Sequence, residues 1–450
     1  MIISSQMLLL KGKNKMSTDK VDKIELQEQD EKYEIFHQRY INKSREIASK
    51  YLQELEALPG EPEEFAYFKN IIRKVFIDNE VVKYSDDEKL IGSFCVTMPS
   101  EVVHAAGARP LKLCSSSYVG FHIGDYVTPR DMCPLIKSVV GNVYGKISEI
   151  YQACDMYVVP IACDGKKKLA SQLSNVKPTL PLYLPLNRDD DSGMDMYVKE
   201  VKNIADKISE ITGIEVTRES LAKEIKKHAE VQREVKRFAK LKGESGILIR
   251  GSHALTVMNS LAYDDIYSWG EHLKKLNDEL VKRRDKQEFL TKKKLPRILL
   301  TGSPITFPNI KIPLIIEEQG GIIAADETCL SDRGVSDLVS VCDDSLNGYY
   351  RALANRYVRS CSCPIFPDNE TRIHKLEKMV KEEHIDGIIY HVLRSCVVYD
   401  YEFAQIEKHF SAKGIPVIRL ESDYNEEDIE QLRIRIEAFI EMIKFKKKGK

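Results

Sequence analysis

Residues 156–173 read MYVVPIACDGKKKLASQL, and this stretch contains the unit that decides the fold. Its first part, which ends at Cys163, has the unbroken apolar run of a strand buried on both faces. Its second part begins with Asp164, a residue type that caps helix N-termini, and continues as a helix. A buried strand that passes through a cysteine directly into a helix is typical of a parallel sheet with helical crossovers.

The same pattern recurs on both sides of a long charged region. Further strands are expected in the first half at 89–95, 110–114 and 178–186, and in the second half at 297–302, 320–329, 386–396 and 415–422. Strands that alternate with helices predict a doubly wound, Rossmann-like sheet. The fold class is therefore α/β, with two parallel-sheet lobes that repeat one plan, and with the candidate site between the lobes.

Four regions are predicted along the chain. They are a helical N-terminal extension over 1–84, a first α/β lobe over 85–194, a helical layer or connector over 195–295, and a second α/β lobe with a C-terminal helix over 296–450. Within the extension, Pro59-Gly60 breaks the helical periodicity. Residues 1–15 are expected to be disordered, with Met16 as an alternative start.

Composition limits the class of protein. The chain has 450 residues, 43% of them hydrophobic and 30% charged, and a formal net charge of -1, which is the composition of a soluble multidomain protein. This balance disfavours partners such as nucleic acid or an anionic membrane. No apolar run is long enough to span a bilayer, and no export signal is evident. A cytoplasmic location is expected, where the ten cysteines stay reduced.

Six cysteines form two matching sets of three, one in each half of the chain. The sets are Cys95, Cys133 and Cys163 in the first half and Cys329, Cys363 and Cys396 in the second. Each lies in or beside the end of a predicted strand or at a turn that opens a helix. Ligands of open parallel sheets bind beyond the carboxyl ends of the strands. A helix N-terminus near a thiol favours thiolate and a negatively charged metal cluster.

Other interpretations of these cysteines remain open. A single strand cysteine is most often a small buried hydrophobe. A zinc site is disfavoured because no CxxC pair exists. The four remaining cysteines, Cys114, Cys154, Cys342 and Cys361, are assigned mainly to packing, although Cys361 in the sequence SCSCP competes with Cys363 as a candidate ligand.

Motifs for other chemistries are absent. The sequence has no Walker A motif, GxSxG elbow, HExxH pair or GxGxxG fingerprint, so ATP hydrolysis or NAD binding by this chain is not expected. His104 is interpreted as packed or hydrogen-bonded, and Asp164 as a helix cap. Arg333 could offset cluster charge or bind an acyl-CoA phosphate, with a surface role equally open. No catalytic residue is assigned.

Several segments in order carry a family resemblance. They are GSFCVTMPSEVVHAAGARP, DMCPLIKS, IACDGKKKL, ADETCLSDRG, and GIPVIRLESDY followed by LRIRIEAFIEMI. Together they span about 85–445 and resemble the 2-hydroxyacyl-CoA dehydratase and benzoyl-CoA reductase family. The SCSCP pattern is similar to the double-cubane cluster proteins of that family. SCSCPIFPDN departs from related chains, which often have Met after the second Cys.

The resemblance implies a cofactor and partners. Cys95, Cys133 and Cys163 would ligate one cubane of an [8Fe-9S] cluster, and Cys329, Cys363 and Cys396 the other. It further implies a homodimer and a partner iron–sulfur ATPase that donates low-potential electrons, in an oxygen-sensitive, anaerobic setting.

Three functions stay open on the sequence. The first is an ATP-dependent iron–sulfur oxidoreductase that reduces a small substrate. The second is a 2-hydroxyacyl-CoA dehydratase subunit with one [4Fe-4S] cluster, which removes water through a radical. The third is a non-catalytic electron carrier. Six ligands in one chain favour the first function.

Overall fold

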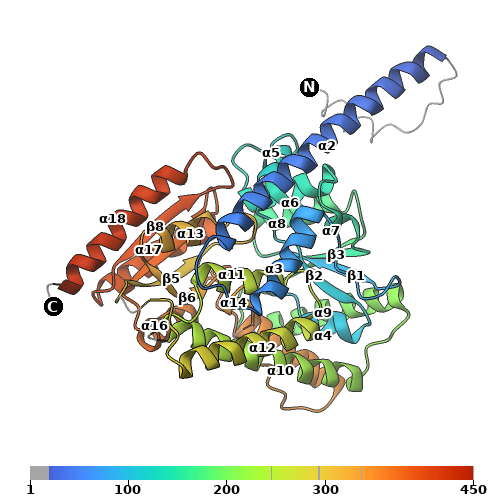
Figure 1. The fold of residues 1–450 in the computed structure, drawn as a ribbon. Coiled ribbons are helices and arrows are strands. Elements are labelled where there is room, and N and C mark those ends of the chain that lie inside the picture. Colours follow the sequence, from blue (N-terminus) through green and yellow to red (C-terminus); the bar gives the residue numbers. More distant parts are fainter. Residues whose placement is uncertain (1–19, 245, 292–293, 336, 449–450) are drawn as a thin grey trace.

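Two four-stranded parallel sheets form the framework of the protein (Figure 1). The structure is a computed structural model, and it describes residues 20–244, 246–291, 294–335 and 337–448. The first sheet has the order β2-β1-β3-β4, with β1 (Leu90–Ser93), β2 (Arg109–Lys112), β3 (Met156–Pro160) and β4 (Thr179–Leu182). The second has the order β6-β5-β7-β8, with β5 (Arg297–Gly302), β6 (Ile322–Glu327), β7 (Gly387–Leu393) and β8 (Val417–Ser422).

The two sheets have the same topology, and every neighbouring pair of strands is parallel. The central strands β1, β3 and β7 are buried along their whole length and β5 at all but its first residue, as the apolar runs predicted. The α/β class with two Rossmann-like lobes is confirmed. The eight strands lie within or overlap the segments expected from the sequence.

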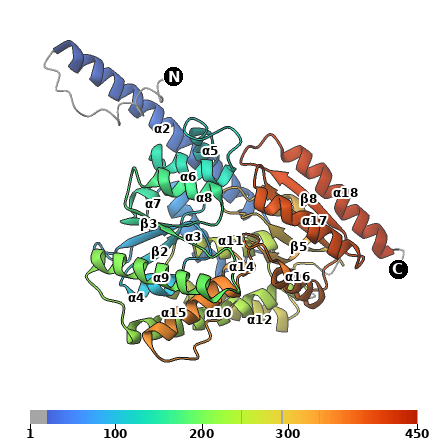
Figure 2. The same cartoon turned by 180° about the vertical axis from the view of Figure 1, so that it is seen from behind.

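Helices cover the sheets and connect their strands (Figures 1 and 2). Those of the first lobe are α4 (Ser100–Ala105), α5 (Tyr118–Gly124), α6 (Pro134–Tyr144), α7 (Glu149–Gln152) and α8 (Asp164–Leu173). Those of the second half are α13 (Lys311–Glu318), α14 (Asp332–Val335), α15 (Leu346–Ala354), the π-helix η2 (Asn355–Arg359), α16 (Glu370–Glu382), α17 (Val397–Ser411) and α18 (Ile429–Lys448).

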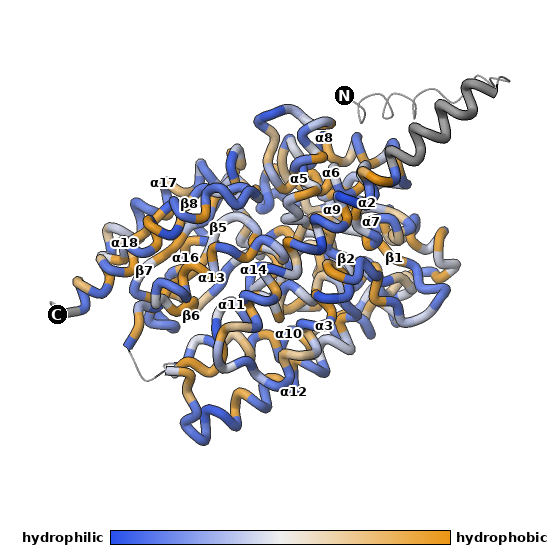
Figure 3. The backbone as a smooth tube through the Cα atoms, turned by 45° about the horizontal axis from the view of Figure 1, so that its top comes forward, coloured by the Kyte–Doolittle hydropathy of each residue, from blue (hydrophilic) through white to orange (hydrophobic). Residues whose placement is uncertain are grey.

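The region between the sheets in sequence is helical, as predicted. It contains α9 (Asp191–Thr212), α10 (Arg218–Gly243), α11 (Gly251–Ser260) and α12 (Ile266–Asp285). Thr217 and Ser220 form a reciprocal capping box at the start of α10. Helix α10 packs against both α12 and α4, so this helical region contacts the first lobe directly. Along the backbone, blue and orange segments alternate through these helices, as expected for amphipathic elements (Figure 3).

The N-terminal region consists of α2 (Lys20–Glu56), α3 (Phe65–Arg73) and the π-helix η1 (Lys74–Asp78). The predicted break is confirmed, because α2 ends before Gly60, which has a positive φ of 86°. The N-terminal end of α2 projects from the body of the protein (Figure 1). Its C-terminal part enters the main core through Tyr51, Leu52 and Leu55. The expectation of disorder over 1–15 lies outside the described residues.

One segment of the second half packs away from its own sheet. Tyr350, Leu353 and Tyr357, from α15 and η2, belong to the apolar core that contains Ile91 of β1 and Val102 of α4. The chain thus crosses from the second sheet to the first lobe and then returns through α16. In the described part of the chain, no helix combines the length and apolar character needed to cross a membrane.

Candidate functional site

Three of the six cysteines occupy the same local position. Cys133, Cys163 and Cys396 are the residues immediately before α6, α8 and α17, where they serve as the N-cap residues. Cys133 precedes Pro134, which is well suited to the first helical position because its missing N–H is not needed there. The free backbone N–H groups of each first turn therefore face a sulfur atom. These three thiols therefore lie at helix N-termini, as the sequence predicted.

These three cysteines come together although they belong to both lobes. A hydrogen bond with the Cys396 thiol, supported by the backbone N–H groups of Leu135 and Ile136, lowers the pKa of Cys133 to about 7. The same contact raises the pKa of Cys396, which also interacts with Cys163. We call Cys133, Cys163 and Cys396 the helix-cap group. Cys133 and Cys396 therefore titrate as a pair, which loses its first proton more readily than its second.

The other three cysteines form a second group. Cys363 is buried, and its neighbours include the thiols of Cys329 and Cys95. The Tyr399 hydroxyl lies 3.5 Å from the Cys329 sulfur and 4.0 Å from the Cys363 sulfur. We call Cys95, Cys329 and Cys363 the core group, because all three pack in or against the core that η2 shares with the first lobe. Burial raises the pKa of Cys363 well above its ordinary value.

This grouping differs from the lobe-by-lobe sets expected from the sequence. The structure pairs Cys133 with Cys396 across the lobes, and it brings Cys95 of the first lobe near Cys363. The reason is the segment from α15 to Phe366, which leaves the second sheet and packs on the first lobe. Contacts between these cysteines therefore run across the two lobes as well as within each lobe.

Two side chains connect the two groups. Tyr399 belongs to the first turn of α17, whose N-cap is Cys396 of the helix-cap group, and its hydroxyl reaches the core group. Lys166 is buried, and its ammonium group donates a hydrogen bond to the Phe94 carbonyl. Burial raises the pKa of Cys163, and the charge of Lys166 opposes that rise as well as favouring the lowered pKa of Cys133. Tyr399 therefore reaches from the helix that Cys396 caps to two sulfur atoms of the core group.

A buried charge network supports the core group. Arg333 donates from Nη1 to the Cys329 sulfur at 3.4 Å and pairs through Nη2 with Glu327 at 2.7 Å. Arg372 contacts Glu327 at 2.6 Å and Glu402 at 2.8 Å. Burial alone would raise the pKa of Glu327, but the two arginines lower it to about 2. Arg333 is therefore a buried residue of the site, which excludes the surface role.

A cavity of about 90 Å³ opens beside the core group. The residues of its wall that carry polar side chains or sulfur include His104, Lys112, His228, Cys329, Arg356 and Tyr357. His104 Nδ1 and His228 Nε2 are 2.9 Å apart and hydrogen-bonded, which confirms the interpretation of His104. Burial lowers the pKa of both histidines to about 3, so both are uncharged at neutral pH. Burial also lowers the pKa of Lys112 to about 8.

The structure supports some of the sequence assignments for the remaining cysteines and Asp164 and corrects others. Cys114 and Cys154 are buried packing residues, as predicted. Cys361 is also buried, beside Cys363. Cys342 is exposed, so its assignment to packing is wrong. Asp164 is the first residue of α8 rather than its cap, because Cys163 occupies the N-cap position.

Some residues of the site gave no signal in the sequence. Tyr399 and Arg372 lie in ordinary amphipathic helices, and their roles depend on how α16 and α17 dock. Glu224 and His228 are spaced four residues apart on α10, which places them on one face of that helix. This spacing could have indicated that the two side chains share a site, but it was not noticed among the many charged residues of α10.

Comparison with known proteins assigns the chain to a family. A model of the family described as 2-hydroxyglutaryl-CoA dehydratase, D-component, matches residues 95–443. The dehydratase subunit YjiM of Escherichia coli K12 is 31% identical over 79% of this chain and 91% of its own length. The beta subunit of (R)-phenyllactyl-CoA dehydratase from Clostridium sporogenes is 25% identical over 84% of this chain and 98% of its own.

A reductase is related as well. One of the subunits of benzoyl-CoA reductase from Thauera aromatica is 21% identical over 79% of this chain and 91% of its own length. The family match covers all six cysteines of the two groups. The chain belongs to the 2-hydroxyglutaryl-CoA dehydratase D-component family.

Proposed function

We propose that this chain is an iron–sulfur enzyme in which the helix-cap group and the core group together hold one [8Fe-9S] double-cubane cluster. Each group would supply three sulfur ligands to one cubane. The cluster would take low-potential electrons from a partner ATPase and pass them to a small substrate. The observation that carries the proposal is the arrangement of six sulfur atoms as two adjacent groups of three.

The residues fit such a cluster chemically. All ten cysteines are free thiols, and contacts join Cys133 to Cys396 and Cys363 to its neighbours Cys329 and Cys95. Iron–sulfur clusters are bound by thiolates and carry net negative charge, which hydrogen-bond donors and cations offset. Here the first turns of α6 and α8, together with Arg333 and Lys166, supply those donors and charges. When bound, the cluster would supply storage and transfer of single electrons at low potential.

The protein's own residues have definable tasks in this scheme. Cys363 is almost fully buried, so its sulfur is shielded from water and dioxygen. Tyr399 and Arg333 hold the Cys329 sulfur in place by hydrogen bonds. The cavity beside Cys329 gives a small substrate access to the site. Homodimerisation belongs to this proposal, as do an anaerobic setting and cytoplasmic location.

A second candidate function is a 2-hydroxyacyl-CoA dehydratase subunit with one [4Fe-4S] cluster. It is supported by the names of relatives, since the phenyllactyl-CoA and 2-hydroxyglutaryl-CoA proteins are dehydratase beta subunits. In that case one group of three cysteines would hold the cluster, and the other would remain as thiols. Only this second arrangement leaves three of the six cysteines as thiols in the loaded protein.

Anaerobic purification followed by iron and acid-labile sulfide analysis tests the proposal. About eight irons per chain support the double cubane, and about four support the dehydratase arrangement. Stoichiometric zinc without iron contradicts both. Assay with the partner ATPase, ATP and a reductant then separates the activities, because loss of water from a 2-hydroxyacyl-CoA is expected only of the dehydratase.

A further inference from the structure

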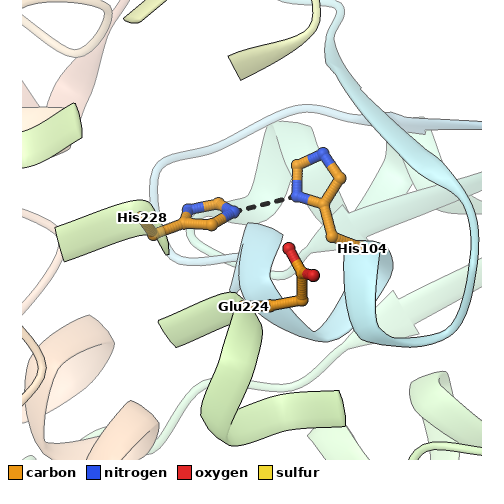
Figure 4. A group of neighbouring side chains, drawn as sticks. All are labelled: His104, Glu224 and His228. Carbon is orange, nitrogen blue, oxygen red and sulfur yellow. Dashed lines mark hydrogen bonds between the residues drawn. The ribbon is translucent and has the colours of Figure 1, made fainter. Parts of the chain in front are cut away.

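Three side chains outside the cysteine groups lie close together (Figure 4), and two of them, His104 and His228, line the cavity. His104 comes from α4, and Glu224 and His228 come from successive turns of α10. One ligand atom from each of the three residues lies within 4.8 Å of the other two. Figure 4 shows the Glu224 carboxylate directed toward the two imidazoles. The set contains two nitrogen donors and one oxygen donor, with no sulfur.

The Glu224 carboxylate lacks a partner on this side. Glu224 is 8% exposed, and its Oε2 atom is buried without any hydrogen bond. Its other oxygen contacts the Lys227 ammonium at 3.4 Å. A buried carboxylate oxygen without a donor is costly, because it loses hydration and gains nothing in return. Neither imidazole donates a hydrogen bond to Oε2, so a bound cation is the natural way to satisfy this atom.

A second carboxylate, that of Glu101, lies near the Nδ1 atom of His228, as carboxylates often do beside a histidine that binds a metal. Glu101 is fully buried, and its Oε1 atom lies 3.9 Å from His228 Nδ1 with no hydrogen bond of its own. Its Oε2 atom accepts a hydrogen bond from the Tyr357 hydroxyl at 2.7 Å. Histidine ligands usually present one ring nitrogen to the metal and the other to a carboxylate, which fixes the ring. His228 is placed to do both.

We propose that His104, Glu224 and His228 bind one zinc-like divalent cation, at a site separate from the six cysteines, with an open coordination position toward the cavity. Two imidazoles and one carboxylate form a three-residue set known for zinc centres that leave a position for water or substrate. Both histidines line the cavity. Lys112 and Arg356 line the same cavity, so the ligand expected at the open position is an anionic oxygen.

Magnesium and calcium fit this set less well. They prefer six or more oxygen ligands, whereas imidazole nitrogen suits zinc and its neighbours. The competing arrangement is a plain hydrogen bond between two neutral histidines, which accounts for their 2.9 Å contact but leaves Glu224 Oε2 and Glu101 Oε1 without partners. The two arrangements differ in metal content, which can be measured directly.

The test measures zinc binding to the anaerobically purified, cluster-loaded protein. Zinc, iron and sulfide are quantified per chain, and Zn²⁺ is titrated by calorimetry. Glu224→Gln keeps the shape of the side chain, and His228→Asn removes one nitrogen donor. Gln232→Ala is the matched control, since Gln232 lies one turn further along α10 and lines the same cavity. We expect one zinc per chain, bound at least about tenfold more weakly by E224Q and H228N, and unchanged in Q232A.

X-ray absorption at the zinc edge identifies the ligands. The proposal predicts nitrogen and oxygen at about 2.0–2.1 Å and no sulfur at about 2.3 Å. It is overturned if no zinc binds, if E224Q and H228N bind it as well as the native chain, or if sulfur ligands appear. Iron and sulfide are expected to be equal in all four proteins, so failure of the cluster proposal would show separately.

Discussion

The two lobes share one sheet topology but place their cysteines differently. Cys163 follows β3, and Cys396 follows the equivalent strand β7, and both are helix N-caps. Cys114 follows β2 as Cys329 follows the equivalent β6, yet Cys114 packs in the core with its thiol donating to the Phe94 carbonyl. Cys95 follows β1, whereas β5 leads into Ser303 and no cysteine. Equal numbers of cysteines in the two halves therefore do not mean equivalent positions.

The lobes also hold their site residues by different means. In the first lobe, α5 and α6 approach each other at Gly120 and Gly141, and serine hydroxyls cap and link the turns. In the second lobe, a network of buried charges is centred on Glu327. Backbone contact is insensitive to pH and ions, whereas buried charges depend strongly on each partner. The lobes should consequently respond differently to substitution.

The largest expected effect is in the charge network of the second lobe. Arg333→Met removes one of the two arginines that pair with Glu327, and it leaves that carboxylate underpaired in a fully buried place. Loss of one partner of a buried ion pair costs about 3–5 kcal/mol. Anaerobic denaturation in guanidinium chloride measures this cost. Arg359→Gln is the control, since its ion pair with Asp191 is exposed, and a loss below about 1 kcal/mol is expected there. Equal losses in the two variants would contradict the account.

The second largest loss of stability is expected where α5 and α6 approach each other closely. A Cβ atom at Gly141 would overlap the Gly120 carbonyl and lie 2.9 Å from the Gly124 backbone nitrogen. Backbone atoms cannot rotate away, so Gly141→Ala is expected to destabilise the protein by about 3 kcal/mol and to displace the helix that carries Cys133. Gly414→Ala, with a positive φ of 76° and open space around it, should cost only about 1 kcal/mol. Thermal and chemical unfolding of both variants would reveal whether the first lobe depends on this contact.

The acid sensitivity of the second lobe should depend on a buried histidine in a central strand of its sheet. The last residue of β5 pairs with His391, whereas the last residue of β1 pairs with Val158. Burial lowers the pKa of His391 to about 4. Because the unfolded chain binds this proton at higher pH, His391 contributes stability that is complete above pH ~6.5 and is lost as pH falls toward about 4.

His391→Gln should flatten the pH dependence of the unfolding free energy between about pH 6.5 and pH 4, by up to about 3 kcal/mol over that interval. Replacement of the exposed His374 by Gln is the control and should leave the slope unchanged. An unchanged slope in H391Q would show that this imidazole does not carry the acid response of the second lobe.

The smallest effect is expected at a helix cap of the first lobe. Ser117 accepts a hydrogen bond from the Gly120 backbone nitrogen at 3.0 Å at the start of α5. Ser117→Ala is expected to cost about 1 kcal/mol, measured as a shift in the denaturation midpoint. Ser117→Asp, which retains an acceptor, should recover part of this loss. A larger loss of stability in S117A than in G141A would contradict the order of effects proposed for this lobe.

The sequence predicted the framework well because its signals are local. Buried apolar runs located all eight strands, and the Cys-Pro pair at 133–134 indicated a helix start. The grouping of the cysteines was not predictable in this way, because it depends on where the segment from α15 to Phe366 docks. The roles of Tyr399 and Arg372 were not predicted for the same reason, because they depend on the tertiary packing of α16 and α17. His104 was interpreted correctly as hydrogen-bonded, but its partner His228 was not identified.

The central claim is that the cysteines act in groups drawn from both lobes. The most direct measurement is the iron content per chain of C133S, of C396S, and of the two double variants C133S/C396S and C133S/C95S. Substitutions within one group should not have additive effects on iron content, so C133S/C396S should lose no more iron than either single variant. Substitutions in different groups should add, so C133S/C95S should lose clearly more iron. If C133S/C95S instead behaves like C133S alone while C133S/C396S loses more, the cysteines act lobe by lobe and the account is contradicted.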